Sequence, residues 1–345
     1  MSELALQAAT PEELAAAVGI PLADARKVVS AVHAERWLRA PLPTLRRESR
    51  EAARAAGTEP RLAVISIQKS EQDPFVKLLL EAPDGARFEA VRIPLERAGR
   101  FSVCVSAQVG CALGCAFCAT GRLGLSRNLE VWEIVEQVRA VRRTLGAGER
   151  VHGVVFQGMG EPMANLDRVL GAIRVLMDPC AQAIDARNIT VCTSGLPAGI
   201  ERLAREAPKV RLGVSIGSAL APVRRSLMPI SAAHDLDAVL EAAAAHARAT
   251  GLAPLWAVAL LDGTNDGPEH ARALAERVHA FTTRAGVRPR LTIIPYNPIG
   301  PGDPFKRSSN EDAFRDELAR NGVFSHKRYS GGADVGAACG QLVAR

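Results

Sequence analysis

The sequence predicts an α/β fold in which six strand–loop–helix units form an incomplete barrel, preceded by a small helical and antiparallel region. From about residue 101 onward, short apolar segments alternate with longer segments of helical periodicity, which is the pattern of a parallel sheet covered by helices. Turns rich in small residues follow several of the strand segments. The length of 345 residues, 48% hydrophobic and 23% charged, suits one large globular domain with a smaller one.

The chain divides into three expected regions, residues 1–57, 58–100 and 101–345. The first predicts short helices. Thr10 before Pro11 is a helix start signal, and Pro21 marks a second start. A third helical pattern carries Arg46, Arg47, Arg50 and Arg54. These arginines suit a solvated helix face or, as the second interpretation, an RNA-contacting one.

Residues 58–100 predict a small antiparallel element that leads into the main domain. Its strands are expected at residues 62–67, 76–80 and 88–93, with a turn at Pro83-Asp84-Gly85.

Residues 101–345 predict the incomplete barrel and a C-terminal tail that carries a cysteine. Strands are expected at 101–106, 151–156, 189–193, 210–216, 255–261 and 291–294, helices at segments such as 129–145, 236–249 and 269–281, and a late strand at 323–328. In barrels of this type, the chemistry lies at the carboxyl ends of the strands.

Three cysteines, Cys111, Cys115 and Cys118, follow the first barrel strand on one short loop. Thiolates are the usual ligands of iron–sulfur clusters. Three of them on a four-iron cluster leave one iron open to a small molecule with an amine and a carboxylate, such as S-adenosylmethionine (SAM). A structural zinc site and unrelated buried thiols are the alternatives, but zinc favours four ligands in paired units, and the sequence has no second pair.

Small and polar residues end the later strands. The second strand leads to Gly160 and Glu161, whose carboxylate can hold the ammonium of an amino acid. Cys192, Ser215 and Asn297 follow at the ends of the third, fourth and sixth strands. A plain turn or helix cap is an equally good interpretation of each hydroxyl-bearing strand end taken singly.

Two further cysteines remain outside the cluster loop. Cys104 lies on the first barrel strand, and Cys339 lies in a tail of small residues that would let a bulky substrate approach. Either could be an inert small hydrophobe, but a glycine-rich segment is an unusual place for a core residue, which favours a reactive thiol at Cys339. Cys180 has no motif around it and is expected to be structural.

Composition points to a soluble cytoplasmic protein that is not a membrane protein. The seven cysteines are an odd number with three clustered, which argues against a secreted disulfide framework. The N-terminus lacks the pattern of a signal peptide, and the longest apolar run, residues 252–261, is too short to span a bilayer. A formal net charge of +6 is compatible with a polyanionic partner.

The chain resembles the radical SAM RNA adenine methyltransferases of the RlmN/Cfr type, from about residue 60 to the end and more weakly before. The matching stretches are residues 88–94, 104–118, 128–138, 158–162, 228–230, 262–266, 294–298, 307–309 and 337–342. The resemblance implies a partial radical SAM barrel, a [4Fe-4S] cluster on the three cysteines of the loop, and SAM contacts at Gly160, Glu161, Ser215 and Asn297, with Cys192 at the position where the family usually has serine.

The resemblance also implies a reaction in which two SAM molecules take part. Cys339 takes a methyl group from one SAM, and a radical made from the second removes hydrogen from that methyl group. The methylene radical adds to an adenine ring carbon of RNA, Glu89 removes the ring proton, and Cys104 attacks the sulfur of Cys339, which releases the product and leaves a disulfide. A cellular reductant such as flavodoxin or a thioredoxin-like protein would complete the cycle, and the enzyme is expected to be a monomer.

The expected substrate is 23S rRNA at adenine carbon 2, with tRNA as a further substrate of some members. Methylation at carbon 8, which gives antibiotic resistance, is the close alternative. The chain departs from the family at Cys192, Gly217, Gly331 and Ala333, which motivates a second hypothesis, a paralogue with the same chemistry on a non-ribosomal substrate. A non-catalytic RNA-binding protein with a relic cluster is the third.

Overall fold

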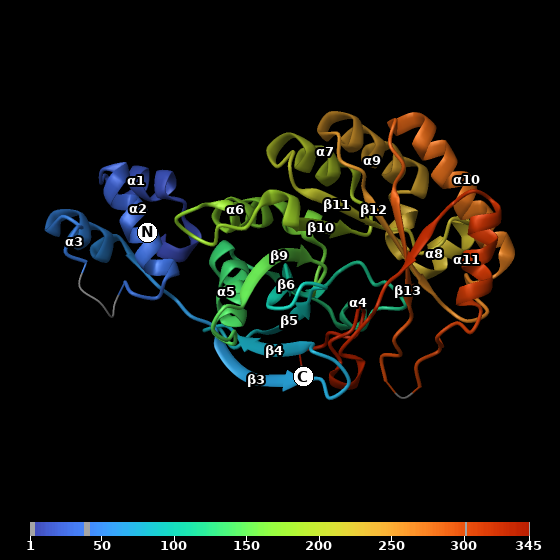
Figure 1. The fold of residues 1–345 in the computed structure, drawn as a ribbon, viewed down its shortest axis with the longest axis horizontal. Helices are drawn as coiled ribbons and strands as arrows, with labels where there is room; N and C mark the ends of the chain where they lie inside the picture. Colours follow the sequence, from blue (N-terminus) through green and yellow to red (C-terminus); the bar gives the residue numbers. More distant parts are fainter. Residues whose placement is uncertain (1–3, 38–41, 301, 345) are drawn as a thin grey trace.

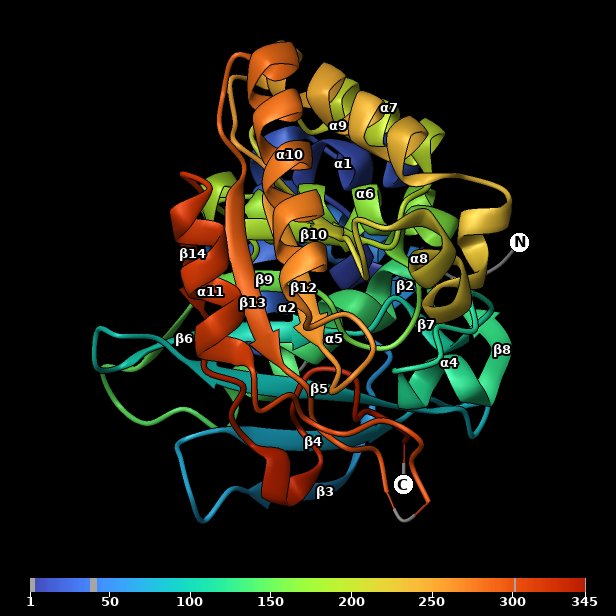
Figure 2. The ribbon, with the colours of Figure 1, turned by 90° about the vertical axis from the view of Figure 1, so that its right-hand side faces the viewer.

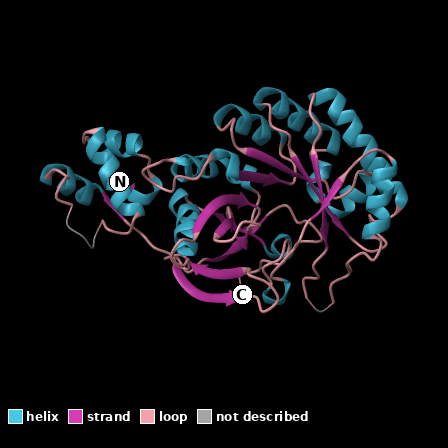
Figure 3. Ribbon diagram, in the orientation of Figure 1, coloured by secondary structure: helices cyan, strands magenta, loops and turns pink. Residues whose placement is uncertain are grey.

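The computed structural model describes residues 4–37, 42–300 and 302–344. Its centre is a sheet of ten strands in the order β14-β13-β12-β11-β10-β9-β6-β5-β4-β3 (Figures 1 and 3). Their bounds are β3 Ala63–Lys69, β4 Val76–Glu81, β5 Arg87–Pro94, β6 Arg100–Val105, β9 Arg150–Phe156, β10 Ile189–Thr193, β11 Arg211–Ser215, β12 Leu255–Leu260, β13 Arg290–Pro295 and β14 Ser325–Lys327.

Within this sheet, the strands β6, β9, β10, β11, β12, β13 and β14 are all parallel, so their carboxyl ends meet at one edge. The prediction of a partial barrel is confirmed, and the late strand expected at 323–328 is β14, which joins the six barrel strands as a seventh parallel strand. The sheet does not close, because β14 at one edge and β3 at the other do not pair with each other.

The antiparallel element is part of this sheet. Strands β3, β4 and β5 pair antiparallel in sequence order, and β5 pairs antiparallel with β6 in a register that sets Val91 opposite Cys104. This join explains how residues well before the barrel reach its active edge.

The helices lie outside the barrel strands (Figure 2). They are α5 Val131–Arg142, α6 Leu166–Met177, α7 Pro197–Glu206, α8 Ala221–Leu227, α9 Leu236–Thr250, α10 Pro268–Ala285 and α11 Glu311–Arg320. Strand β12 shows how the layers are made: Trp256 is buried and its ring lies 5.0 Å from that of Phe281 on α10, whereas the alternating Ala257 and Ala259 line a cavity. Small side chains on the inner face therefore leave room for a ligand.

The N-terminal helices have a hydrophobic core of their own, which includes Leu14, Val28 and Trp37. They are α1 Pro11–Val18, α2 Leu22–His33 and α3 Arg47–Ala56, and short strands β1 Leu4–Ala5 and β2 Gly57–Thr58 pair beside them. The start signal at Thr10 is confirmed, because its hydroxyl accepts from the amide of Glu13, whose carboxylate accepts from the Thr10 amide. Among the helices of the described ranges, none has the length and apolar character that a bilayer crossing needs.

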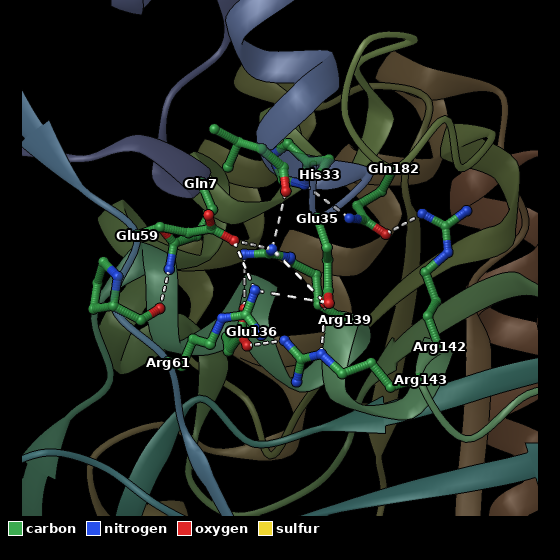
Figure 4. A network of polar contacts seen from close by, with 12 residues as sticks. Gln7, His33, Glu35, Glu59, Arg61, Glu136, Arg139, Arg142, Arg143 and Gln182 are labelled. Carbon is green, nitrogen blue, oxygen red and sulfur yellow. Dashed lines mark hydrogen bonds and ion pairs between the residues drawn. The ribbon is translucent and has the colours of Figure 1, made fainter. Parts of the chain in front are cut away.

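A buried ionic network joins the N-terminal helices to α5 (Figure 4). Arg139 on α5 pairs with Glu59 at 2.6 Å and with Glu136 at 2.9 Å, and it also donates to the carbonyl of Val32 on α2. Beside it, His33 is hydrogen-bonded to Gln182 at 2.8 Å. These contacts fix the helical region on the outer side of the barrel.

Candidate functional site

The cluster loop is held by a β-hairpin at the carboxyl edge of the sheet. Strands β7 Gln108–Cys111 and β8 Gly124–Asn128 pair antiparallel and enclose α4 Ala119–Leu123. Cys111 ends β7 and Cys118 immediately precedes α4. All three loop cysteines, Cys111, Cys115 and Cys118, line one cavity at this edge.

The loop thiols are chemically suited to an iron–sulfur cluster. Burial raises the pKa of Cys111 to about 11 and that of Cys115 to about 12, and the positive charge of a bound metal would favour their thiolate forms. Across the described residues, no three histidine, cysteine or acidic side chains converge on a single metal ion. Three soft ligands spread along one cavity wall fit a multi-iron cluster better than a lone zinc ion.

Gly160 and Glu161 follow β9 and line the same cavity. The Glu161 carboxylate is 3% exposed and accepts from the backbone amides of Met163 at 3.0 Å and Ser194 at 2.9 Å. Burial raises the pKa of this carboxyl group against the effect of those amides. Because a carboxylate has about four acceptor positions, Glu161 can still receive an ammonium group.

The structure brings Cys192 and Ser215 to the same cavity but gives Asn297 another position. Cys192 and Ser215 are among the residues that line it, whereas Asn297, 5% exposed, is not among them. Its amide nitrogen donates to the Ser330 hydroxyl at 2.8 Å and lies 3.5 Å from the carbonyl oxygen of Cys339. Asn297 therefore holds the C-terminal tail, and its contact with SAM stays a prediction.

A second cavity contains both Cys104 and Cys339. Cys339 also lines the first cavity, so it forms part of the wall that the two cavities share. Burial and the neighbouring Cys339 raise the pKa of Cys104 to about 12, against the opposing charge of Arg328. The expected disulfide is not supported, because all seven cysteines are free thiols.

The tail that carries Cys339 is tied to the cluster loop and its helix. The amide of Ala119 donates to the carbonyl of Gly340 at 2.7 Å, and the Thr120 hydroxyl donates to that of Leu342 at 2.6 Å. These bonds from α4 hold Cys339, which itself lies in no helix or strand, beside the loop cysteines.

Glu89 lies behind the same tail, on β5. Its carboxylate is fully buried, pairs with Lys77 at 3.0 Å and accepts from the backbone amide of Val343 at 2.8 Å. Glu89 is not among the residues that line the cavity of Cys104 and Cys339. Its assignment as a base stays a prediction that requires the tail to shift.

Sequence reasoning did not single out Arg328 or the aromatic residues Phe75 and Tyr329, which line the second cavity. The Arg328 guanidinium donates to the Gln157 side chain at 3.1 Å, and the nearby thiols of Cys339, Cys192 and Cys104 raise its pKa. Phe75 lies in the β3–β4 connection, so no motif near the cysteines could have indicated it.

Comparison with known proteins agrees with this geometry. A family model of the radical SAM superfamily matches residues 105–258. The chain is 58% identical to a probable RNA methyltransferase of Sorangium cellulosum, over 96% of this chain and 90% of that protein. It is 42% identical to the dual-specificity RNA methyltransferase RlmN of Syntrophobacter fumaroxidans, over 82% of this chain and 81% of that protein.

A solved structure covers nearly the whole chain. The crystal structure of a radical SAM methyltransferase from Sphaerobacter thermophilus has a TM-score of 0.87 and 34% identity, over 99% of this chain and 100% of that one. The chain therefore belongs to the radical SAM RNA methyltransferases, the enzyme family of RlmN.

Proposed function

We propose that this enzyme methylates carbon 2 of an adenine in 23S rRNA, with tRNA as a further substrate, and that the methyl group travels on Cys339. The observation that carries the proposal is the position of Cys339 in the walls of both cavities. A thiol there can take a methyl group on one side and present it to a nucleobase on the other.

In this proposal, the first cavity holds the cofactors. The cluster loop would bind a [4Fe-4S] cluster through Cys111, Cys115 and Cys118. The residues expected to contact SAM are Gly160, Glu161, Cys192, Ser215 and Asn297, of which Asn297 also holds the tail. When bound, the cluster and SAM supply a methyl donor and a carbon radical able to remove hydrogen from a methyl group. The Glu161 carboxylate orients the ammonium of SAM, supported by its two amide donors.

The second cavity holds the reacting nucleobase. Adenine ring carbons 2 and 8 are electrophilic, so ordinary displacement on SAM cannot methylate them, whereas the methylene radical left when hydrogen is removed from the methyl group on Cys339 can add to such a carbon. The adduct must then lose one electron, for which a bound cluster would be the acceptor, and one proton, which Glu89 takes after the tail shifts from its carboxylate. Cys104 then attacks the sulfur of Cys339: a sulfur–sulfur bond forms, the carbon–sulfur bond breaks, and its electron pair stays on the carbon, which takes a proton to complete the methyl group of the released product.

Release in this way oxidises the two thiols together by two electrons. A reductant of the flavodoxin or thioredoxin class must therefore restore them after each turnover. The N-terminal helices and the net charge of +6 support RNA binding through phosphates.

A second candidate is the same chemistry on a non-ribosomal RNA. The observation that favours it is Gly331, where the family usually has arginine. A Cβ there would lie 2.5 Å from Cδ2 of Phe75, so this position has no room for a side chain.

The test is an anaerobic reaction of the reconstituted enzyme with SAM, a reductant and an unmethylated 23S rRNA transcript or unmethylated tRNA. We expect 2-methyladenosine in the digested 23S rRNA by mass spectrometry. 8-Methyladenosine would identify the alternative carbon. Methylated Cys339 without any methyladenosine in either RNA would overturn the ribosomal assignment and favour the non-ribosomal substrate.

A further inference from the structure

Tyr329 lies where the second cavity meets solvent. Its side chain lines the cavity that contains Cys104 and Cys339, yet the residue is 67% exposed. The whole chain has two tyrosines, and the other, Tyr296, is buried. An exposed aromatic ring at the edge of the cavity of Cys104 and Cys339 therefore needs a physical explanation.

Tyr329 forms a pair with Phe75, and both are held in place by one carboxylate. The ring centroids are 6.1 Å apart with an interplanar angle of 57°. Asp73 accepts from the Tyr329 hydroxyl at 2.9 Å and from the amide of Phe75 at 3.0 Å. The tyrosine ring is thus fixed before any ligand arrives, which reduces the entropy lost on binding.

The backbone of the tail is built around this pair. Asp73 also accepts from the amide of Gly332 at 2.9 Å. A Cβ at Gly331 would lie 2.5 Å from Cδ2 of Phe75 and 2.6 Å from the carboxylate of Asp73. The absence of a side chain at Gly331 is therefore what lets Phe75 lie against the tail beside Tyr329.

We propose that the exposed ring of Tyr329, backed by the buried ring of Phe75, is a stacking platform for a nucleobase of the RNA substrate at the entrance of the Cys104–Cys339 cavity. The proposal rests on the proposed function, because it assigns the RNA to that cavity. Proteins that read single-stranded RNA stack unpaired bases on aromatic side chains. A base that is to react at Cys339 must first leave its own stack, and an exposed ring at the entrance compensates for the lost contact.

The first test uses the holoenzyme and three variants. In Tyr329→Ala, we expect the KM for the 23S rRNA transcript to rise about tenfold or more, since base–aromatic stacking carries that order of free energy. Tyr329→Phe keeps the ring and loses only the bond to Asp73, so its KM should stay within about threefold of the wild-type value. Phe324→Ala removes an aromatic side chain that is 78% exposed and lines neither of the two cavities, and should leave KM unchanged.

The second test does not depend on methyl transfer. A short adenosine-rich RNA containing 2-aminopurine should lose fluorescence on binding to the wild type and to Tyr329→Phe, and much less on binding to Tyr329→Ala. If Tyr329→Phe is as impaired as Tyr329→Ala in both tests, Tyr329 only anchors the tail, and the platform is wrong. Unchanged quenching in Tyr329→Ala also overturns it. Quenching that depends on the Tyr329 ring, with no methyladenosine from the wild type, overturns the proposed function and leaves the platform in place.

Discussion

Lys77 and Glu89 form a buried ion pair on neighbouring strands, with 3.0 Å between the ammonium nitrogen and the carboxylate oxygen. Their side chains are 7% and 0% exposed, and the other carboxylate oxygen accepts from the amide of Val343. The carboxylate proposed as a base is thus neutralised by a lysine and covered by the tail that carries Cys339. Glu89 can remove a proton from RNA only after the tail has moved off its carboxylate. Exposure of the proposed base is therefore coupled to movement of the segment that carries Cys339.

Replacing Lys77 tests the energetic part of this relationship. Lys77→Met leaves Glu89 buried without its partner and should lower the free energy of unfolding by about 3–5 kcal/mol in urea titrations. The double variant Lys77→Met/Glu89→Gln removes the unpaired charge and should recover most of the loss. A single variant as stable as the wild type would mean that Glu89 is not ionised in the folded protein.

Replacing a loop cysteine tests the cluster assignment. Cys115→Ala should lose the iron bound after anaerobic reconstitution together with the visible absorption of the cluster, because two thiolates hold a four-iron cluster poorly. Cys180→Ala is the matched control, since Cys180 lies near the N-terminal helices and away from the loop. Full iron content in Cys115→Ala would contradict the assignment of this ligand.

Two arginines join the N-terminal helices to the barrel, the buried Arg139 on α5 and the exposed Arg174 on α6, and we expect their replacement to lower the free energy of unfolding by unequal amounts. Arg139→Met removes the buried partner that Glu59 and Glu136 share and leaves them only the partly exposed Arg61 and Arg143, which should cost up to about 3–5 kcal/mol. Arg174→Met breaks an exposed 3.1 Å pair with Glu13 and should cost at most about 1 kcal/mol. Hydrogen exchange of α1 and α2 measures both, and equal protection in the two variants would refute the role of the network.

The same interface should respond to acid through His33. Burial, together with the charges of Arg139 and Arg142, lowers the pKa of His33 from 6.5 to about 3. In this pH range His33 binds a proton in the unfolded chain but not in the folded chain. The free energy of unfolding therefore decreases as the pH falls below 6.5. Between pH 7 and pH 5, the loss should be on the order of 2 kcal/mol.

The variant His33→Asn isolates this contribution. It cannot titrate in this range, so its free energy of unfolding should fall less than that of the wild type over the same pH interval. Equal slopes for the two proteins would show that His33 does not report on this interface.

The sequence predicted the parts of the fold that have local signals. The barrel strands and the helix starts at Thr10 and Pro21 follow from apolar periodicity and capping chemistry. The hairpin around the cluster loop was missed, because β7 and β8 pair across the cysteine segment and carry no turn signature of their own. The joining of β5 to β6 was also missed, since strand pairing is decided by packing between separate segments.

The site divides in the same way. The loop cysteines share a motif and could be named from spacing, whereas Asp73, Phe75 and Tyr329 meet across more than two hundred residues. From the sequence alone, Gly331 is only a position at which the family's usual arginine is missing. The structure shows that Phe75 occupies the space that a side chain there would need. Asn297 follows a strand end as expected, but its hydrogen bonds go to the tail.

The central claim, that the methyl group reaches RNA by way of Cys339, is tested most directly with SAM whose transferred methyl group is fully deuterated. Over many turnovers, hydrogen removal from the methyl group on Cys339 should leave two of the three deuterium atoms in the methyladenosine. The third should appear in 5′-deoxyadenosine, both products being measured by mass spectrometry. Methyladenosine that retains all three deuterium atoms, or that forms undiminished in Cys339→Ala, would contradict the account.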